Sequence, residues 1–157
     1  MRLMVRSLLF SLLVFFCIGS TCKIYGQSVT YFAKYDKLAD SLSRIYKIPS
    51  CIILSVGFLE SGGGTSNVAK KLHNHFGIVG DCNYRVSRYK SSYKYYPTIR
   101  ESFIGFCELM KSKKFYASMV GSKDQKLWAK KIAATGYAAN PTKWSNAVYS
   151  ISKKYCN

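Results

Sequence analysis

The sequence is poor in acidic residues. Its 157 residues contain 7 Asp and Glu against 24 Lys and Arg, which gives a formal net charge of +17. A charge of this size draws a protein toward polyanions such as nucleic acid, anionic lipid or anionic cell-wall polymer. The scarcity of acids also restricts carboxylate chemistry to a few positions. A basic, solvated surface without any partner is the alternative reading of the same charge.

Metal-binding patterns are also lacking. The chain has 2 His, at His73 and His75, and no Cys-x-x-Cys spacing. Two residues apart is the wrong spacing for two ligands on one helical face, and no third ligand lies nearby in the sequence. The sequence therefore predicts no metal site and no cofactor.

There is no long transmembrane stretch, internal repeat or linker, and the length fits one domain. The hydrophobic stretch Leu8 to Gly19 is shorter than the roughly 20 residues that a membrane-spanning helix needs. Arg2 and Arg6 precede it, which is the layout of a secretory signal peptide. We expect a signal peptide over residues 1–26 and a single domain over residues 27–157.

Export is therefore expected, to the periplasm, the cell envelope or the extracellular space. A lipoprotein anchor at Cys22 is the alternative, although Gly19-Ser20-Thr21 is a poor lipobox. Export argues against nucleic acid as the natural partner and leaves an anionic cell wall or membrane surface. We expect a monomer.

Four of the six cysteines, Cys51, Cys82, Cys107 and Cys156, lie in the predicted domain and allow three pairings. Export would permit disulfides. Cys51 and Cys107 fall within apolar helical faces, where a free cysteine behaves as a small hydrophobic residue. We expect those two as buried thiols, with a Cys82–Cys156 bridge as an open possibility.

A central stretch combines an apolar helix with a single acid. Pro49 suits a first helical turn, and the residues from Cys51 to Leu59 are almost wholly apolar. Glu60 follows, and then Gly62, Gly63 and Gly64 break the helix. Apolar neighbours and the helix C-terminus should both raise the pKa of Glu60, which suits a general acid. Alternatively, Glu60 is only the first solvated residue after a core helix.

The rest of the chain predicts a mainly helical α+β domain. Tyr31, Tyr35, Leu38, Leu42 and Ile45 recur at helical spacing over residues 30–47. Thr98 and Glu101 form a capping box, and Asn140-Pro141 opens a last helix. Residues 81–96 lose helical periodicity, and their alternating tyrosines predict a β-hairpin that turns near residues 90–92.

Several motifs together resemble one family, the bacterial endo-β-N-acetylglucosaminidases of glycoside hydrolase family 73, which includes flagellar peptidoglycan hydrolases and autolysins. The matching positions span about residues 40–155 in the family's order: Tyr46-Lys47-Ile48-Pro49, Leu59-Glu60-Ser61-Gly62, Ser66, Asn74-His75-Phe76-Gly77-Ile78, Tyr96, Glu101-Ser102-Phe103, Gly136-Tyr137-Ala138 and Asn140-Pro141. Each motif is weak alone, and their order makes the set specific.

The resemblance implies a lysozyme-like fold with a small β-lobe beside a glycan cleft. It implies hydrolysis of the β-1,4 bond after N-acetylglucosamine in peptidoglycan, with Glu60 as the general acid. Substrate contacts are then expected from the following residues: Ser61, Asn74, Phe76, Tyr93 and Tyr96. Alternatively, Asn74 could hydrogen-bond the backbone of its own turn, and the tyrosines could pack against neighbouring side chains without contacting the substrate.

The second catalytic group is less clear, because the hairpin segment from Cys82 to Tyr96 has no acid. Some relatives have a second carboxylate in that lobe, and this chain lacks it. Asp81, just before the lobe, is the remaining candidate. Otherwise the substrate's own acetamido group can assist, a known variant of glycoside hydrolysis. Tyr137 is then the candidate that orients the acetamido group, unless it is a core tyrosine.

Two other functions remain open. A lytic transglycosylase also uses one Glu on this fold, but usually has Gly-Leu-Met-Gln where this chain has Asn-His-Phe-Gly-Ile at residues 74–78. A non-catalytic, basic wall-binding or nucleic-acid-binding protein would bind tightly and release no products. Its binding would weaken with salt.

Overall fold

The structure is a computed structural model that describes residues 30–156. The predicted signal peptide and the alternative lipid anchor at Cys22 lie outside the described residues. Within residues 30–156, none of the helices combines the length and apolar character of a bilayer span.

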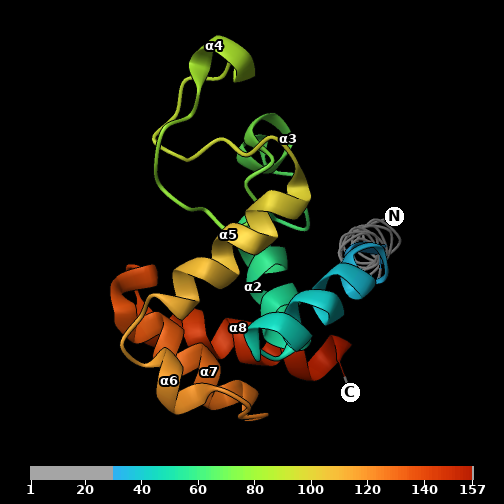
Figure 1. Cartoon of the computed structure of the whole chain (residues 1–157), viewed down its shortest axis with the longest axis vertical. Helices are drawn as coiled ribbons and strands as arrows, with labels where there is room; N and C mark the ends of the chain where they lie inside the picture. The colour runs from blue at the N-terminus through green and yellow to red at the C-terminus, as the bar shows by residue number, and fades with distance from the viewer. Residues whose placement is uncertain (1–29, 157) are drawn as a thin grey trace, which may run out of the picture.

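Helix α2 (Ser50–Ser61) is the centre of the fold, as the sequence predicts. It lies among the other helices (Figure 1), is apolar on every side and buries Ile52, Ile53, Leu54 and Val56. Gly57 lets its neighbours approach closely, because an added Cβ would lie 2.7 Å from the Tyr31 hydroxyl oxygen. The helix ends at Gly62, whose φ of 57° is the left-handed conformation that favours glycine.

The other helices surround α2. Their bounds are a first helix over residues 30–46, then α3 (Asn67–Leu72), α4 (Tyr84–Ser87), α5 (Ile99–Lys111), α6 (Tyr116–Met119), α7 (Gln125–Ile132), the π-helical turn η1 (Ala133–Tyr137) and α8 (Pro141–Tyr155). Helix α8 packs against both α2 and α7. Figure 1 shows α4 at one end of the long axis and α6 and α7 at the other.

The predicted helix starts are present. Thr98 and Glu101 make both hydrogen bonds of a capping box at the start of α5. The Asn140 side chain accepts a hydrogen bond from the Lys143 N–H, and Pro141 occupies the first turn of α8. These local signals work because they satisfy backbone N–H groups that the helix itself leaves unpaired.

The predicted β-hairpin is wrong. The two ends of the segment do pair, through a bridge between Val79 and Tyr93 that is the single isolated bridge found within residues 30–156. Between them the chain forms the helical turn α4, where Tyr84 and Val86 are exposed. Alternating tyrosines favour a strand only where a neighbouring strand or a core covers one face, and nothing among the described residues covers these two.

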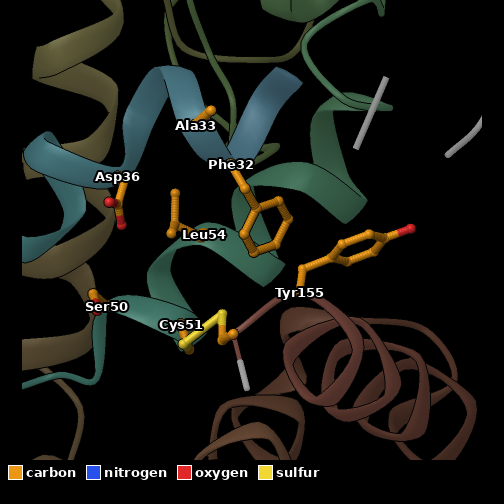
Figure 2. Close-up of a pocket in the computed structure, with 8 residues that line it drawn as sticks. Phe32, Ala33, Asp36, Ser50, Cys51, Leu54 and Tyr155 are labelled. Carbon is orange, nitrogen blue, oxygen red and sulfur yellow. A yellow bond between two sulfur atoms is a disulfide. The ribbon is translucent and has the colours of Figure 1, made fainter. Parts of the chain in front are cut away.

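The disulfide prediction is also wrong. Cys51 pairs with Cys156, which joins the start of α2 to the end of α8, with Cα atoms 5.9 Å apart (Figure 2). Cys82 is instead a buried free thiol. Cys107 is a buried free thiol as predicted, and its pKa is raised to about 12 by burial and by the charge of Glu108. Apolar neighbours could not reveal the partner of Cys51, which lies 105 residues away.

Candidate active site

Glu60 lies in the last turn of α2 and lines a cleft of about 290 Å³. Ten residues line this cleft: Glu60, Phe76, Gly77, Ile78, Val79, Leu109, Lys113, Thr135, Gly136 and Tyr137. They come from α2, the loop after α3, the end of α5 and η1. The core helix therefore ends at a concave surface, which places its single acid where a ligand can reach it.

The Glu60 carboxyl is half-buried and has one hydrogen-bond donor. The indole N–H of Trp144, on α8, donates to Oε1 of Glu60 at 2.6 Å. Burial raises the pKa of Glu60 above its ordinary value, while the Trp144 hydrogen bond opposes that shift by favouring the ionised form. The carboxyl is thus held in one orientation and kept reluctant to ionise.

Gly77 leaves room for Oε2, the other carboxyl oxygen of Glu60. A Cβ added to Gly77 would lie 3.1 Å from Oε2 of Glu60, and the φ of Gly77 is 63°. Both the close approach and the left-handed backbone favour glycine here. The backbone at Gly77 therefore forms the wall of the cleft opposite the acid.

Asn74 holds this wall in place from inside the protein. Its side-chain N–H groups donate to the carbonyl oxygens of Ile78 at 2.8 Å and Lys94 at 2.9 Å. Its Oδ1 accepts from the backbone N–H groups of Phe76 and Ile78, both at 3.2 Å. Asn74 is 1% exposed, so its side chain shapes the cleft without reaching the surface.

Tyr137 closes the cleft on the η1 side. Its hydroxyl donates to the carbonyl oxygen of Phe76 at 2.6 Å. Burial, with smaller contributions from Glu60 and Tyr96, raises the pKa of Tyr137 well above its ordinary value. The hydroxyl proton is thus engaged with the backbone, and the oxygen retains a lone pair that can accept a hydrogen bond.

Like Asn74, three more of the predicted substrate contacts have buried side chains: Ser61, Phe76 and Tyr96. The Ser61 hydroxyl donates to the Gly57 carbonyl oxygen at 2.6 Å. Phe76 stacks on Phe106 with ring centroids 4.4 Å apart. These side chains support the cleft from behind. Tyr93, at 37% exposed, is the one aromatic of the set that reaches the surface, close to Gly77.

Asp81 lies apart from the acid. It is exposed, and its Oδ1 accepts a hydrogen bond from the N–H of Asn83 at 2.8 Å in the turn that leads to α4. Val79 lines the cleft, but Asp81, two residues further on, does not. A local turn explains the Asp81 carboxylate, which leaves Glu60 as the single carboxyl in the cleft.

Sequence reasoning missed Trp144 and Lys113. Nothing in the sequence connects the Trp144 indole with an acid 84 residues away. Lys113 is one of many lysines, and its place in the cleft depends on how α5 packs. Neither position carries a local signal.

A larger hollow of about 490 Å³ lies beside the Cys51–Cys156 disulfide. Figure 2 shows Phe32, Leu54 and Tyr155 around it, with Asp36 as its one acid. It does not include Glu60. Within residues 30–156, no group of three or more His, Cys, Asp and Glu side chains could hold a metal ion.

A half-buried carboxyl in the cleft of a mainly helical domain is an arrangement that a glycoside hydrolase can use to donate a proton. The chain belongs to the Glucosaminidase family, described as mannosyl-glycoprotein endo-β-N-acetylglucosaminidase, whose family model matches residues 30–157. The family predicted from the sequence motifs is thereby confirmed. The comparison with curated proteins found no match.

Two solved structures are similar to the chain in fold. One is a type VI secretion system effector–immunity complex from Pseudomonas protegens, with a TM-score of 0.59, 17% identity, and coverage of 83% of this chain and 95% of that one. The other is a peptidoglycan hydrolase mutant from Sphingomonas sp. A1, with a TM-score of 0.62, 16% identity, and coverage of 79% and 92%. The predicted mainly helical, lysozyme-like fold is confirmed.

Proposed function

We propose that the protein hydrolyses peptidoglycan at the β-1,4 bond after N-acetylglucosamine, with Glu60 as the general acid. The observation that carries the proposal is the Glu60 carboxyl itself, half-buried in the cleft with a raised pKa. Membership of the Glucosaminidase family supports the sugar, and the likeness to a peptidoglycan hydrolase of the same fold supports the polymer.

The first step would be proton transfer from Glu60 to the glycosidic oxygen. As the bond from C1 to that oxygen breaks, its electron pair stays with the leaving sugar and the proton neutralises it. Glu60 becomes a carboxylate, and the Trp144 indole N–H stabilises that charge through its 2.6 Å hydrogen bond. The same hydrogen bond holds the carboxyl in position beforehand.

The positive charge that develops at C1 would be stabilised by the substrate itself. With Glu60 the single carboxyl in the cleft, the carbonyl oxygen of the 2-acetamido group attacks C1 and forms a cyclic oxazolinium ion. Water then opens the ring at C1, and the Glu60 carboxylate accepts the proton that the water loses. The hydroxyl oxygen of Tyr137 can accept a hydrogen bond from the acetamido N–H, which would orient it for attack.

The test of this function is Glu60→Gln, assayed on purified peptidoglycan with mass spectrometry of the products. The amide retains an oxygen for the Trp144 hydrogen bond but cannot donate the acidic proton, so turnover should fall at least about a hundredfold. Glu108→Gln is the matched control, since Glu108 is exposed and lies outside the cleft. Wild-type turnover by the Glu60→Gln enzyme would refute the assignment of the acid.

The products separate this proposal from its rivals. Reducing N-acetylglucosamine ends support the glucosaminidase, whereas anhydro-muramic ends would identify a lytic transglycosylase. Tight, salt-sensitive binding without products would identify a wall-binding protein. We further propose that the protein acts as an exported monomer in the cell envelope, where its net charge of +17 attracts it to anionic wall surfaces. Export argues against nucleic acid as its natural partner.

A further inference from the structure

The cleft that holds Glu60 also contains one cation. Lys113 lies in the turn after α5, where its backbone N–H donates to the Met110 carbonyl oxygen at 3.1 Å. It is half-buried and lines the cleft beside Leu109 and Gly136. Of the ten lining residues, only Lys113 and Glu60 have side chains that carry charge near neutral pH.

The protein does not neutralise the charge of Lys113. The nearest acid along the chain, Glu108, accepts a hydrogen bond from the Tyr46 hydroxyl at 2.6 Å, and no carboxylate of residues 30–156 forms an ion pair with Lys113. The pKa of Glu60 is explained by burial and by Trp144, so Lys113 has no role in holding the acid. A lysine side chain that lines a cleft without a counter-ion favours an anion from outside.

We propose that Lys113 binds a carboxylate of the substrate and makes the cleft select anionic glycan strands over neutral ones. This inference rests on the proposed function, because it concerns the same cleft and the same polymer. Peptidoglycan offers such a carboxylate from two sources. One is the lactyl group of muramic acid where no peptide is attached, and the other is an acidic residue of the stem peptide.

The contact would be a charge-assisted hydrogen bond from the Lys113 ammonium group to the carboxylate. It differs from the general attraction of a +17 protein to polyanions, because it depends on a single side chain inside the cleft. Removing it should weaken substrate binding without changing the chemical step. Loss of the Lys113 charge should therefore raise KM and leave kcat unchanged.

The experiment compares wild type with Lys113→Met on three forms of purified glycan strand. The first is intact, the second has its stem peptides removed by an amidase, and the third is intact with its carboxylates converted to neutral amides by carbodiimide coupling. We expect Lys113→Met to raise KM about fivefold on a strand that presents the carboxylate. On amidated strands the two enzymes should have equal KM.

Two further variants and one pH measurement serve as controls. Lys114→Met removes a neighbouring exposed cation outside the cleft and should leave KM on intact strands unchanged. Lys113→Arg keeps the charge and should retain most of the affinity. The pH dependence of kcat should be the same in Lys113→Met and wild type, since Lys113 does not hold the acid.

The source of the carboxylate follows from which strands respond. A rise in KM on intact strands alone assigns the stem peptide, and a rise on peptide-free strands alone assigns the lactyl group. A rise on both shows that either carboxylate is accepted. No rise on either, or an equal rise on amidated strands, would overturn the inference. Because Glu60→Gln tests the chemistry separately, that outcome would leave the proposed function standing.

Discussion

The helices around α2 and the segment between α3 and α5 are built in different ways. The helices bury a continuous apolar core that includes Ile52, Phe106, Trp128 and Val148. The segment over residues 73–98 has one β-bridge, one helical turn and several exposed apolar side chains. Apolar burial holds the first region, whereas the second is anchored to the core by Phe76 and otherwise depends on a few specific hydrogen bonds. The cleft lies where the two regions meet.

This difference explains how Glu60 is held in a fixed position while the cleft beside it stays accessible. The acid comes from the packed region, so its position follows from the core. The opposite wall, at Gly77, comes from the segment, and the buried Asn74 side chain holds it through four hydrogen bonds. Because hydrogen bonds hold this wall, the Gly77 backbone can lie close to Glu60 without side chains that fill the cleft.

The disulfide tests the packed region, and we expect the largest effect there. Cys51→Ala combined with Cys156→Ala removes a cross-link between residues 105 apart, which should lower the free energy of unfolding by about 4 kcal/mol. Urea unfolding measures this, and reduction of the wild type should reproduce it. The disulfide lies outside the cleft, so kcat should change less than about twofold at 25 °C.

The matched control is Cys82→Ala, which removes a buried thiol that forms no cross-link. It should cost about 1 kcal/mol, with no response to a reducing agent. If the double variant and Cys82→Ala were equally stable, the packed region would not depend on its cross-link.

Asn74→Ala tests the segment. It leaves buried N–H groups of Phe76 and Ile78 without their acceptor, which should lower the free energy of unfolding by about 3 kcal/mol. Activity should fall with it, because Gly77 would no longer be held against Glu60. Asn146→Ala, at an exposed position on α8, is the control and should be close to neutral. A loss below about 1 kcal/mol would show that the bridge alone holds the segment.

His75 tests the junction of the two regions. It belongs to the segment but is 2% exposed among Tyr31, Tyr35 and Phe103, with its Nδ1 3.0 Å from the Tyr31 hydroxyl oxygen. Burial, with smaller effects from the charges of Lys34 and His73, lowers the pKa of His75 to about 4 from an ordinary 6.5. Between these two values the unfolded chain binds a proton that the folded chain does not.

Stability should therefore be complete above about pH 6.5 and decline as the pH falls toward about 4, by on the order of 2–3 kcal/mol. Urea unfolding at a series of pH values measures the decline. His75→Phe removes the titrating group and should flatten the profile over this range, even if the variant is less stable overall. An unchanged slope in His75→Phe would assign the decline to other groups.

Trp144→Phe tests the cleft itself, and the expected effect is the smallest. The indole N–H favours the ionised form of Glu60, so its loss should raise the pKa of that carboxyl further. The basic limb of the pH–activity profile should then move to higher pH. Trp128→Phe removes an indole that bonds the Ser122 carbonyl oxygen and should leave the limb in place. A shift to lower pH would contradict this role of the indole.

The sequence predicted those parts of the site that depend on neighbours along the chain. Glu60 at the end of a buried helix follows from an apolar run and three glycines, and its raised pKa agrees with that prediction. The capping box at Thr98 follows from a four-residue pattern. The motif around Asn74 marked a position whose role only its contacts reveal, since an amide can equally bond its own turn.

The failures involve partners that are distant in the sequence. The alternating tyrosines of residues 84–95 predicted a hairpin, but the pairing that forms is confined to the ends of the segment. Cys51 was predicted to be a buried thiol, but it is partly exposed and bonded to Cys156. Asp81 was the remaining acid by elimination, and a local turn explains it.

By itself, the sequence determined the first helix, the bounds and buried character of α2, the starts of α5 and α8, and the one acid at the end of α2. These depend on hydrogen bonds and periodicity within a few turns, which each stretch of chain carries locally. The tertiary structure alone decided that an indole from α8 donates a hydrogen bond to that acid and that a lysine after α5 lines its cleft. Such contacts depend on how helices pack, because the side chains that meet come from turns far apart in the chain.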